Sequence, residues 1–215
     1  MTNNKNAGYK VNFTNEGGVE GTTRFLKNIC GMWLLERCRK EWTTDYSYPE
    51  LIEAAMAAPA FRSLINPDAP DFYAGGNMVQ KIKDFCAKTN QPVPETVGAV
   101  ARCAYESLAL KYRNALEGLE AMKGQRIDSL NIVGGAINNK FLDQLIADAL
   151  DREVVTGPVE GAAIGNLLTQ AMALGDIKDL DALRQVVRNS ESVETWTPNH
   201  TAAWDEAYET LLKLL

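Results

Sequence analysis

The spacing of apolar residues changes several times along the 215 residues, and each change marks an expected element. Near the start, apolar and polar side chains alternate over residues 9–14, which predicts a strand with one buried face. Three glycines then predict a turn over Asn15–Gly21. From Phe25 to about Trp42 the apolar residues recur at helical steps, with Thr22 or Thr23 as the N-cap. The sequence thus predicts strand, turn and helix in this order.

The middle of the chain has a helical pattern. Apolar stripes predict helices over Pro49–Ala58 and Met78–Lys88, and an irregular segment rich in proline and glycine separates them. The strongest periodicity of the sequence runs from Glu95 to about Lys123, where Gly124 is a suitable C-cap. We therefore expect one long helix at the centre of the chain.

The last ninety residues or so alternate between strand and helix patterns. Short apolar runs predict buried strands at 130–133 and 153–156, and helices are expected from Gly135, over Gly161–Leu174, over Leu180–Val187 and over Ala202–Leu215. Small residues on the Gly161–Leu174 helix favour close packing on a sheet. This order is typical of a helix-rich α/β fold with a partly parallel sheet. No repeat or linker divides the sequence, so we expect a single domain over residues 1–215.

Composition and charge exclude several classes of protein. The chain has 46% hydrophobic residues and a net charge of −6, so it is not disordered as a whole. Its apolar runs are too short to span a bilayer. A pI near 5.0 argues against a nucleic-acid partner. The first ten residues lack the apolar segment of a secretory signal, and we expect a cytoplasmic protein.

The cysteines and the single histidine offer little catalytic chemistry. His200 precedes the last predicted helix, and without a second histidine no Ser-His-Asp or Cys-His machinery is expected. The four cysteines show no zinc-ligand spacing. Cys30 and Cys38 lie eight residues apart in a predicted helix and cannot form a disulfide. Cys86 and Cys103 either meet as a disulfide or remain buried thiols.

Two glycine-rich segments are candidates for ligand binding. Gly134 and Gly135 fall where a strand ends and a helix begins, which is where ligands approach the backbone in open α/β sheets. An ordinary turn is the alternative, because the segment matches neither a Walker A loop nor a GxGxxG motif. Glu16 and Glu20 flank another pair of glycines. Two such carboxylates suit metal binding or acid–base chemistry, or they favour the start of a helix.

Several segments taken together are more specific than any one of them. They occur in order at residues 12–21, 25–29, 31–37, 65–67, 103–109, 132–139 and 157–166. Together they resemble the C-terminal domain of the FGGY family of carbohydrate kinases, from about residue 9 to the end of the chain. The segments Leu-Lys-Asn-Ile and Ile-Asn-Pro favour the branch of this family that acts on L-rhamnulose.

The resemblance implies a fold and a set of contacts. FGGY kinases share an actin-like, ribonuclease-H-like fold in which ATP and sugar lie between two domains. By this resemblance Gly134, Gly135 and Asn139 contact the nucleotide, and Asn28 contacts the sugar. A position near the nucleotide that is usually glutamine in the family is Glu36 here. Its carboxylate would repel phosphates.

The resemblance also implies what this chain does not supply. The family's general base and its phosphate-binding hairpin precede the matching segments, so we expect a fragment that lacks its N-terminal domain and first strands. In the whole enzyme, MgATP would phosphorylate the 1-hydroxyl of L-rhamnulose, with Mg²⁺ held mainly by phosphates and water. This chain would supply nucleotide-side residues, no catalytic residue and no metal ligand, and would be inactive alone. The alternatives are a fuculose, xylulose or autoinducer kinase of the same family, and a non-catalytic binding or assembly module of the same fold.

Overall fold

The computed structural model describes residues 12–199 and 201–215. His200 and residues 9–11, the first half of the strand expected over residues 9–14, lie outside these residues. The chain forms two compact units. The first comprises Met1–Ile127 and Thr201–Leu215, and the second comprises Asp128–His200.

A β-hairpin opens the described part of the first unit. Strand β1 (Thr14–Gly17) pairs antiparallel with β2 (Thr23–Leu26), and an ion pair between Glu16 and Arg24 joins them. The turn is therefore shorter than expected. Thr22 closes it by donating its hydroxyl to the carbonyl of Val19 at 2.7 Å, so it is not a helix N-cap.

The helix expected from Phe25 to Trp42 is wrong in its first third and too long at its end. Residues up to Leu26 belong to β2, residues 27–32 are irregular, and helix α2 covers only Trp33–Arg39. Phe25 stacks on Phe13 with ring centroids 5.0 Å apart. Pairing with β1 thus overrides the helical spacing of the apolar residues here.

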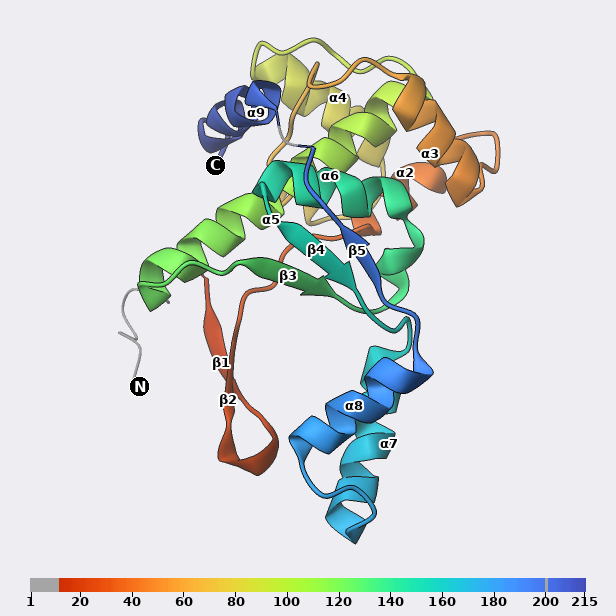
Figure 1. Cartoon of the computed structure of the whole chain (residues 1–215). Helices are drawn as coiled ribbons and strands as arrows, with labels where there is room; N and C mark the ends of the chain where they lie inside the picture. Colours follow the sequence, from red (N-terminus) through yellow and green to blue (C-terminus); the bar gives the residue numbers. More distant parts are fainter. Residues whose placement is uncertain (1–11, 200) are drawn as a thin grey trace. The chain divides into compact units, whose positions relative to one another are not determined.

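Helices form the body of the first unit (Figure 1). They are α3 (Tyr48–Ala57), α4 (Met78–Lys88), α5 (Val97–Lys123) and α9 (Ala202–Leu212). Three of the four agree closely with the expected bounds, and α9 ends earlier than expected. Ser47 and Glu50 form a capping box at α3, and Gly124 ends α5 in the left-handed region. The core surrounds α5, where Ala101, Ala104, Tyr105 and Leu108 are fully buried.

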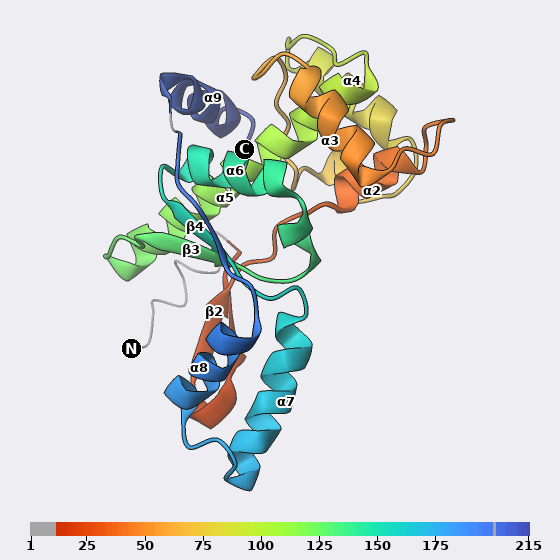
Figure 2. The same ribbon diagram turned by 45° about the vertical axis from the view of Figure 1, so that its right-hand side comes forward.

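A three-stranded sheet forms the centre of the second unit (Figure 2). Strand β3 (Ser129–Ile132) lies parallel to β4 (Glu153–Thr156), and β5 (Glu194–Trp196) lies antiparallel to β4 on its other side. Helix α6 (Lys140–Leu150) connects β3 to β4 and packs on the sheet. The sheet is therefore mixed, as expected, although the sequence pattern did not predict β5.

The remaining helices of the second unit, α7 (Gly161–Leu174) and α8 (Leu180–Ser190), pack against each other. In both views they lie side by side (Figures 1 and 2). Close packing of α7 on the sheet was expected, but it is limited to the first turn, where Gly161 lies against Val133. No residue of α7 is buried. None of the helices in the described part of the chain is long and apolar enough to cross a membrane.

Candidate functional site

The turn around Gly134 connects the ends of the two parallel strands. Gly134 donates its N–H to the carbonyl of Pro158 at 3.1 Å, and Gly157 donates to the carbonyl of Ile132 at 2.7 Å. The loops that follow β3 and β4 are thereby joined at the carboxyl edge of the sheet, the edge at which α/β folds bind ligands. The structure thus places Gly134 and Gly135 where the sequence predicted.

The two glycines have different conformations. Gly134 has φ +92° and ψ −179°, a region that is essentially restricted to glycine. Gly135 has an ordinary φ, and a Cβ built on it would meet no atom within 4 Å. A Cβ on Gly134 would also meet no atom within 4 Å, so the two glycines differ in backbone conformation and both have open space. This part of the turn is therefore open to a ligand.

Asn139 lies between the turn at Gly134 and Gly135 and the first residue of helix α6. Its side-chain oxygen accepts the N–H of Leu142 at 3.0 Å, so it is the N-cap of the helix. Its Nδ2 group is buried and has no hydrogen-bond partner among the described residues. A buried donor without a partner is costly for the fold and suits a ligand acceptor. Asn139 therefore combines a structural role with a free hydrogen-bond donor.

Asp143, one turn further along α6, was not predicted as a notable residue. Its side chain is 1% exposed, and its Oδ2 has no partner among the described residues. Burial and the nearby charge of Glu194 raise the pKa of Asp143 to about 6, against the influence of Lys140. The sequence signal was limited to an acidic residue in the first helical turn, which is common and uninformative.

Glu36 lies on α2, in the first unit, and its carboxylate already has partners. It accepts hydrogen bonds from the hydroxyl of Tyr48 at 2.8 Å and from Nε of Arg39 at 3.2 Å, and Lys40 Nζ lies 3.2 Å away. These donors, Tyr48 first, lower the pKa of Glu36 to about 2. Its charge is therefore balanced within α2 and α3.

Asn28 is exposed in the irregular segment between β2 and α2. It lines a cavity of about 500 Å³ together with residues of the 66–73 loop, among them Asp68 and Tyr73. The backbone N–H of Cys30 donates to Asp68 Oδ1 at 2.8 Å, and Lys111 Nζ lies 3.3 Å from Asp68 Oδ2. Asp68 therefore connects the segment that carries Asn28 to helix α5.

Glu16 and Glu20, the other carboxylates noted in the sequence, do not converge. Glu16 is paired with Arg24 across the hairpin, and Glu20 lies in its turn with φ +56°. No group of three potential metal-ligating side chains occurs among residues 12–199 and 201–215.

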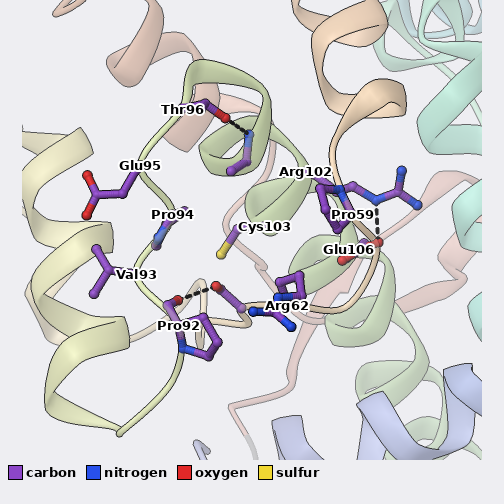
Figure 3. Close-up of a pocket in the computed structure, with 12 residues that line it drawn as sticks. Pro59, Arg62, Pro92, Val93, Pro94, Glu95, Thr96, Arg102, Cys103 and Glu106 are labelled. Atoms are coloured by element: carbon purple, nitrogen blue, oxygen red, sulfur yellow. Dashed lines mark hydrogen bonds and ion pairs between the residues drawn. The ribbon is translucent and has the colours of Figure 1, made fainter.

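A second recess of about 250 Å³, shown in Figure 3, lies where the 59–63 and 92–96 segments meet α5. Two of its charged side chains, Arg102 and Glu106, have structural partners. Arg102 donates to the carbonyls of Ala55, Met56 and Ala58 at the end of α3, and to Glu106 at 2.7 Å. Glu106 also accepts the N–H of Phe61 at 2.8 Å. The recess is therefore a junction that holds α3, the 59–63 segment and α5 together.

The four cysteines are free thiols. Cys86 and Cys103 are close enough for their side chains to share a hydrogen bond, and both lie in the core of the first unit. Burial raises the pKa of Cys38 to about 12. The structure therefore corresponds to the buried-thiol alternative for Cys86 and Cys103.

Residues 2–174 match the family described as "FGGY family of carbohydrate kinases, C-terminal domain". The chain belongs to the FGGY family of carbohydrate kinases. A rhamnulokinase of Bacteroides thetaiotaomicron is 52% identical over 198 residues, which cover 92% of this chain and 41% of the relative. Rhamnulokinases of Enterococcus faecalis and Bacillus subtilis are 42% and 41% identical, and the match covers 39% of each. This FGGY chain thus spans about two fifths of the length of these curated relatives.

Solved FGGY kinase structures have the same fold. A ligand-bound xylulose kinase from Lactobacillus acidophilus superposes with a TM-score of 0.64 and 18% identity, covering 95% of this chain and 40% of the other. A Plasmodium falciparum glycerol kinase with ADP gives a TM-score of 0.61 and 14% identity, covering 94% and 40%. Such low identities establish the fold alone. The helix-rich α/β, actin-like class expected from the sequence is confirmed.

Proposed function

We propose that this chain is the C-terminal, nucleotide-side part of an ATP-dependent kinase that phosphorylates the 1-hydroxyl of L-rhamnulose. The proposal is carried by 52% identity to a rhamnulokinase over 92% of the chain. Relatives from two further genera carry the same name at 41–42% identity. The xylulose and glycerol kinases match at 14–21% identity, which supports the fold and favours no other sugar.

The nucleotide side of the proposed site is the turn after β3. Gly134 and Gly135 would let ATP approach the backbone, and the Nδ2 group of Asn139 would donate to it. Glu36, although balanced by Arg39 and Lys40, is the proposed counterpart of the family's nucleotide-side glutamine. Bound ATP supplies the phosphoryl group, and Mg²⁺ would be held mainly by phosphates and water. Asn28 would contact the sugar.

We infer that the general base comes from an N-terminal domain that precedes the region matched here. The curated relatives are more than twice as long as the matched region. Phosphoryl transfer depends on positioning the sugar hydroxyl and stabilising charge on the phosphate. On this view residues 1–215 form the single C-terminal domain of a cytoplasmic enzyme, and they bind but do not catalyse on their own.

The test is a chimera that joins the preceding part of the Bacteroides thetaiotaomicron rhamnulokinase to this chain. ADP production should depend on L-rhamnulose in the chimera and should be absent for the 215-residue chain alone. L-fuculose and xylulose serve as control sugars. Activity of the chain alone, or a chimera that prefers a control sugar, contradicts the proposal.

A further inference from the structure

The cavity beside Asn28 has the size and polarity of a site for a small neutral ligand. It is open to solvent on one side and has a volume of about 500 Å³, within the range of small-molecule sites. Among its described lining residues Asp68 is the one with a charged side chain, and Lys111 neutralises it at 3.3 Å. A phosphate in this cavity would meet no cation on its lining. An uncharged molecule with several hydroxyl groups fits these partners better.

Two exposed aromatic side chains line the same cavity. Trp33, at the start of α2, is 42% exposed, and Tyr73, in the loop before α4, is 72% exposed. Two exposed aromatic rings that line one cavity give it an apolar rim, and the flat face of such a ring can receive the C–H face of a sugar. Phe72 also lines the cavity, but it is buried and packs on Phe85 with ring centroids 5.6 Å apart. The aromatic lining thus has a fixed base and an open rim.

Contacts of Arg37 and Lys81 connect helix α2, which carries Trp33, to the loop that follows Tyr73 and to helix α4. The Arg37 guanidinium lies 5.9 Å from the ring of Trp33, and a Cβ on Gly75 would meet its Nη2 at 2.6 Å. Arg37 therefore occupies the space between α2 and the loop that follows Tyr73. Lys81 on α4 donates to the carbonyl of Ala74 at 2.6 Å. These contacts hold the backbone of the loop after Tyr73 against α2 and α4, which lowers the entropy that this segment loses on binding.

We propose that Trp33 and Tyr73 determine sugar specificity, by receiving the C–H face and the methyl group of a 6-deoxy ketose in the cavity that Asn28 lines. The inference rests on the proposed function and extends it, because it assigns the recognition of the missing 6-hydroxyl to an apolar aromatic wall. A hydroxyl group on C6 would lose its water against these rings without gaining a partner. Asp68 acts as a positioning residue through its bond to Cys30.

The first test uses the 215-residue chain and the indole N–H signals of its four tryptophans in ¹H–¹⁵N spectra. Trp33→Phe identifies the Trp33 signal. Titration with L-rhamnulose should shift that signal to saturation. L-Fructose, which differs by a hydroxyl on C6, should bind about three- to tenfold more weakly. A Trp33 signal that does not respond, or that responds equally to both sugars, overturns the inference.

The second test uses the chimera. Tyr73→Ala should raise the KM for L-rhamnulose about three- to tenfold and reduce the preference for L-rhamnulose over L-fructose, with kcat nearly unchanged. Trp33→Ala should have the same two effects, and Trp33→Phe should retain most of the preference for L-rhamnulose.

Met56→Ala, which changes an exposed apolar residue outside the cavity, is the matched control. Unchanged preference in Tyr73→Ala overturns the inference. A chimera inactive with every sugar contradicts the proposed function, and the titration then still decides the inference.

Discussion

Gly134 and Gly135 are neighbours, yet a side chain has different consequences at each. Gly134→Ala should lower the free energy of unfolding by about 1–3 kcal/mol, because φ +92° is strained for any residue with a Cβ. Gly135→Val should change the melting temperature little, since its Cβ has open space, but should raise the KM of the chimera for ATP several-fold. Thermal unfolding and steady-state kinetics measure both. A Gly135→Val variant that loses stability and keeps its KM would show that the glycine serves only the turn.

Asp143 should make stability depend on pH between about 4 and 6. Its pKa is raised from the usual 3.8 to about 6, so the folded state holds the proton more tightly than the unfolded state. The stabilisation is complete below pH 4 and is lost as pH rises through 6. Asp143→Asn should therefore raise the free energy of unfolding at pH 7 by on the order of 1–3 kcal/mol and flatten the profile. Urea titrations at pH 4 and pH 7 measure this, with Asp181→Asn on the exposed surface as control. An equal effect at both pH values contradicts the assignment.

At the residue scale, the sequence identified positions more readily than conformations. The glycine pair was predictable because a strand pattern ends and a helical pattern begins there. Gly134, which has the positive φ, donates its N–H to Pro158, 24 residues away. The raised pKa of Asp143 depends on Glu194 in another strand. Contacts of this kind leave no local sequence signal.

Helices and strands whose ends are marked by residues in their own sequence were predicted well. Strands that exist only because they pair with another strand were not. The bounds of α4, β4 and α7 agree with the sequence, and α5 ends at its expected glycine cap. β5 is three residues long, and only its pairing with β4 defines it. β2 was taken for helix because Phe25 and Ile29 have helical spacing, although the strand exists through pairing with β1. In both cases a neighbouring strand decided the structure.

The contact between α3 and α5 depends on a glycine. A Cβ on Gly98 would lie 2.2 Å from the carbonyl oxygen of Ala54, a backbone atom that cannot move aside. Gly98→Ala should therefore lower the free energy of unfolding by about 2–4 kcal/mol. Gly118→Ala, also on α5 but with no contact closer than 3.9 Å, should raise it by up to about 1 kcal/mol. Chemical denaturation of both variants measures the difference. Equal effects would mean that α3 and α5 do not approach this closely.

At the scale of the whole molecule, the amino-acid composition does not change at the boundaries between the two units. The chain leaves the first unit after Ile127 and returns at Thr201, and neither point lies in a run of proline, glycine or serine. Helix α9 then packs on α5: Trp204 meets Phe61 with ring centroids 4.8 Å apart, and Arg113 pairs with Asp205 at 2.8 Å. The sequence therefore contains no local signal that residues 201–215 pack in the same unit as residues before 128.

Two adjacent leucines on α9 test this arrangement. Leu211 is fully buried and Leu212 is 41% exposed. Leu211→Ala should lower the free energy of unfolding by about 2–5 kcal/mol, and Leu212→Ala should lower it by less than about 0.5 kcal/mol. Hydrogen exchange should accelerate in α5 and α9 of Leu211→Ala, whereas β3 and β4 keep their protection. Equal acceleration in both units would mean that they unfold as one.

The return of α9 also sets an order of events during protein synthesis. A ribosome releases the chain from its N-terminus, so residues 128–200 emerge complete while the first unit still lacks its closing helix. Until that helix arrives, the surface of α5 and Phe61 that it covers stays open to water and to chaperones. The first unit therefore cannot be completed before the residues of the second unit have been made.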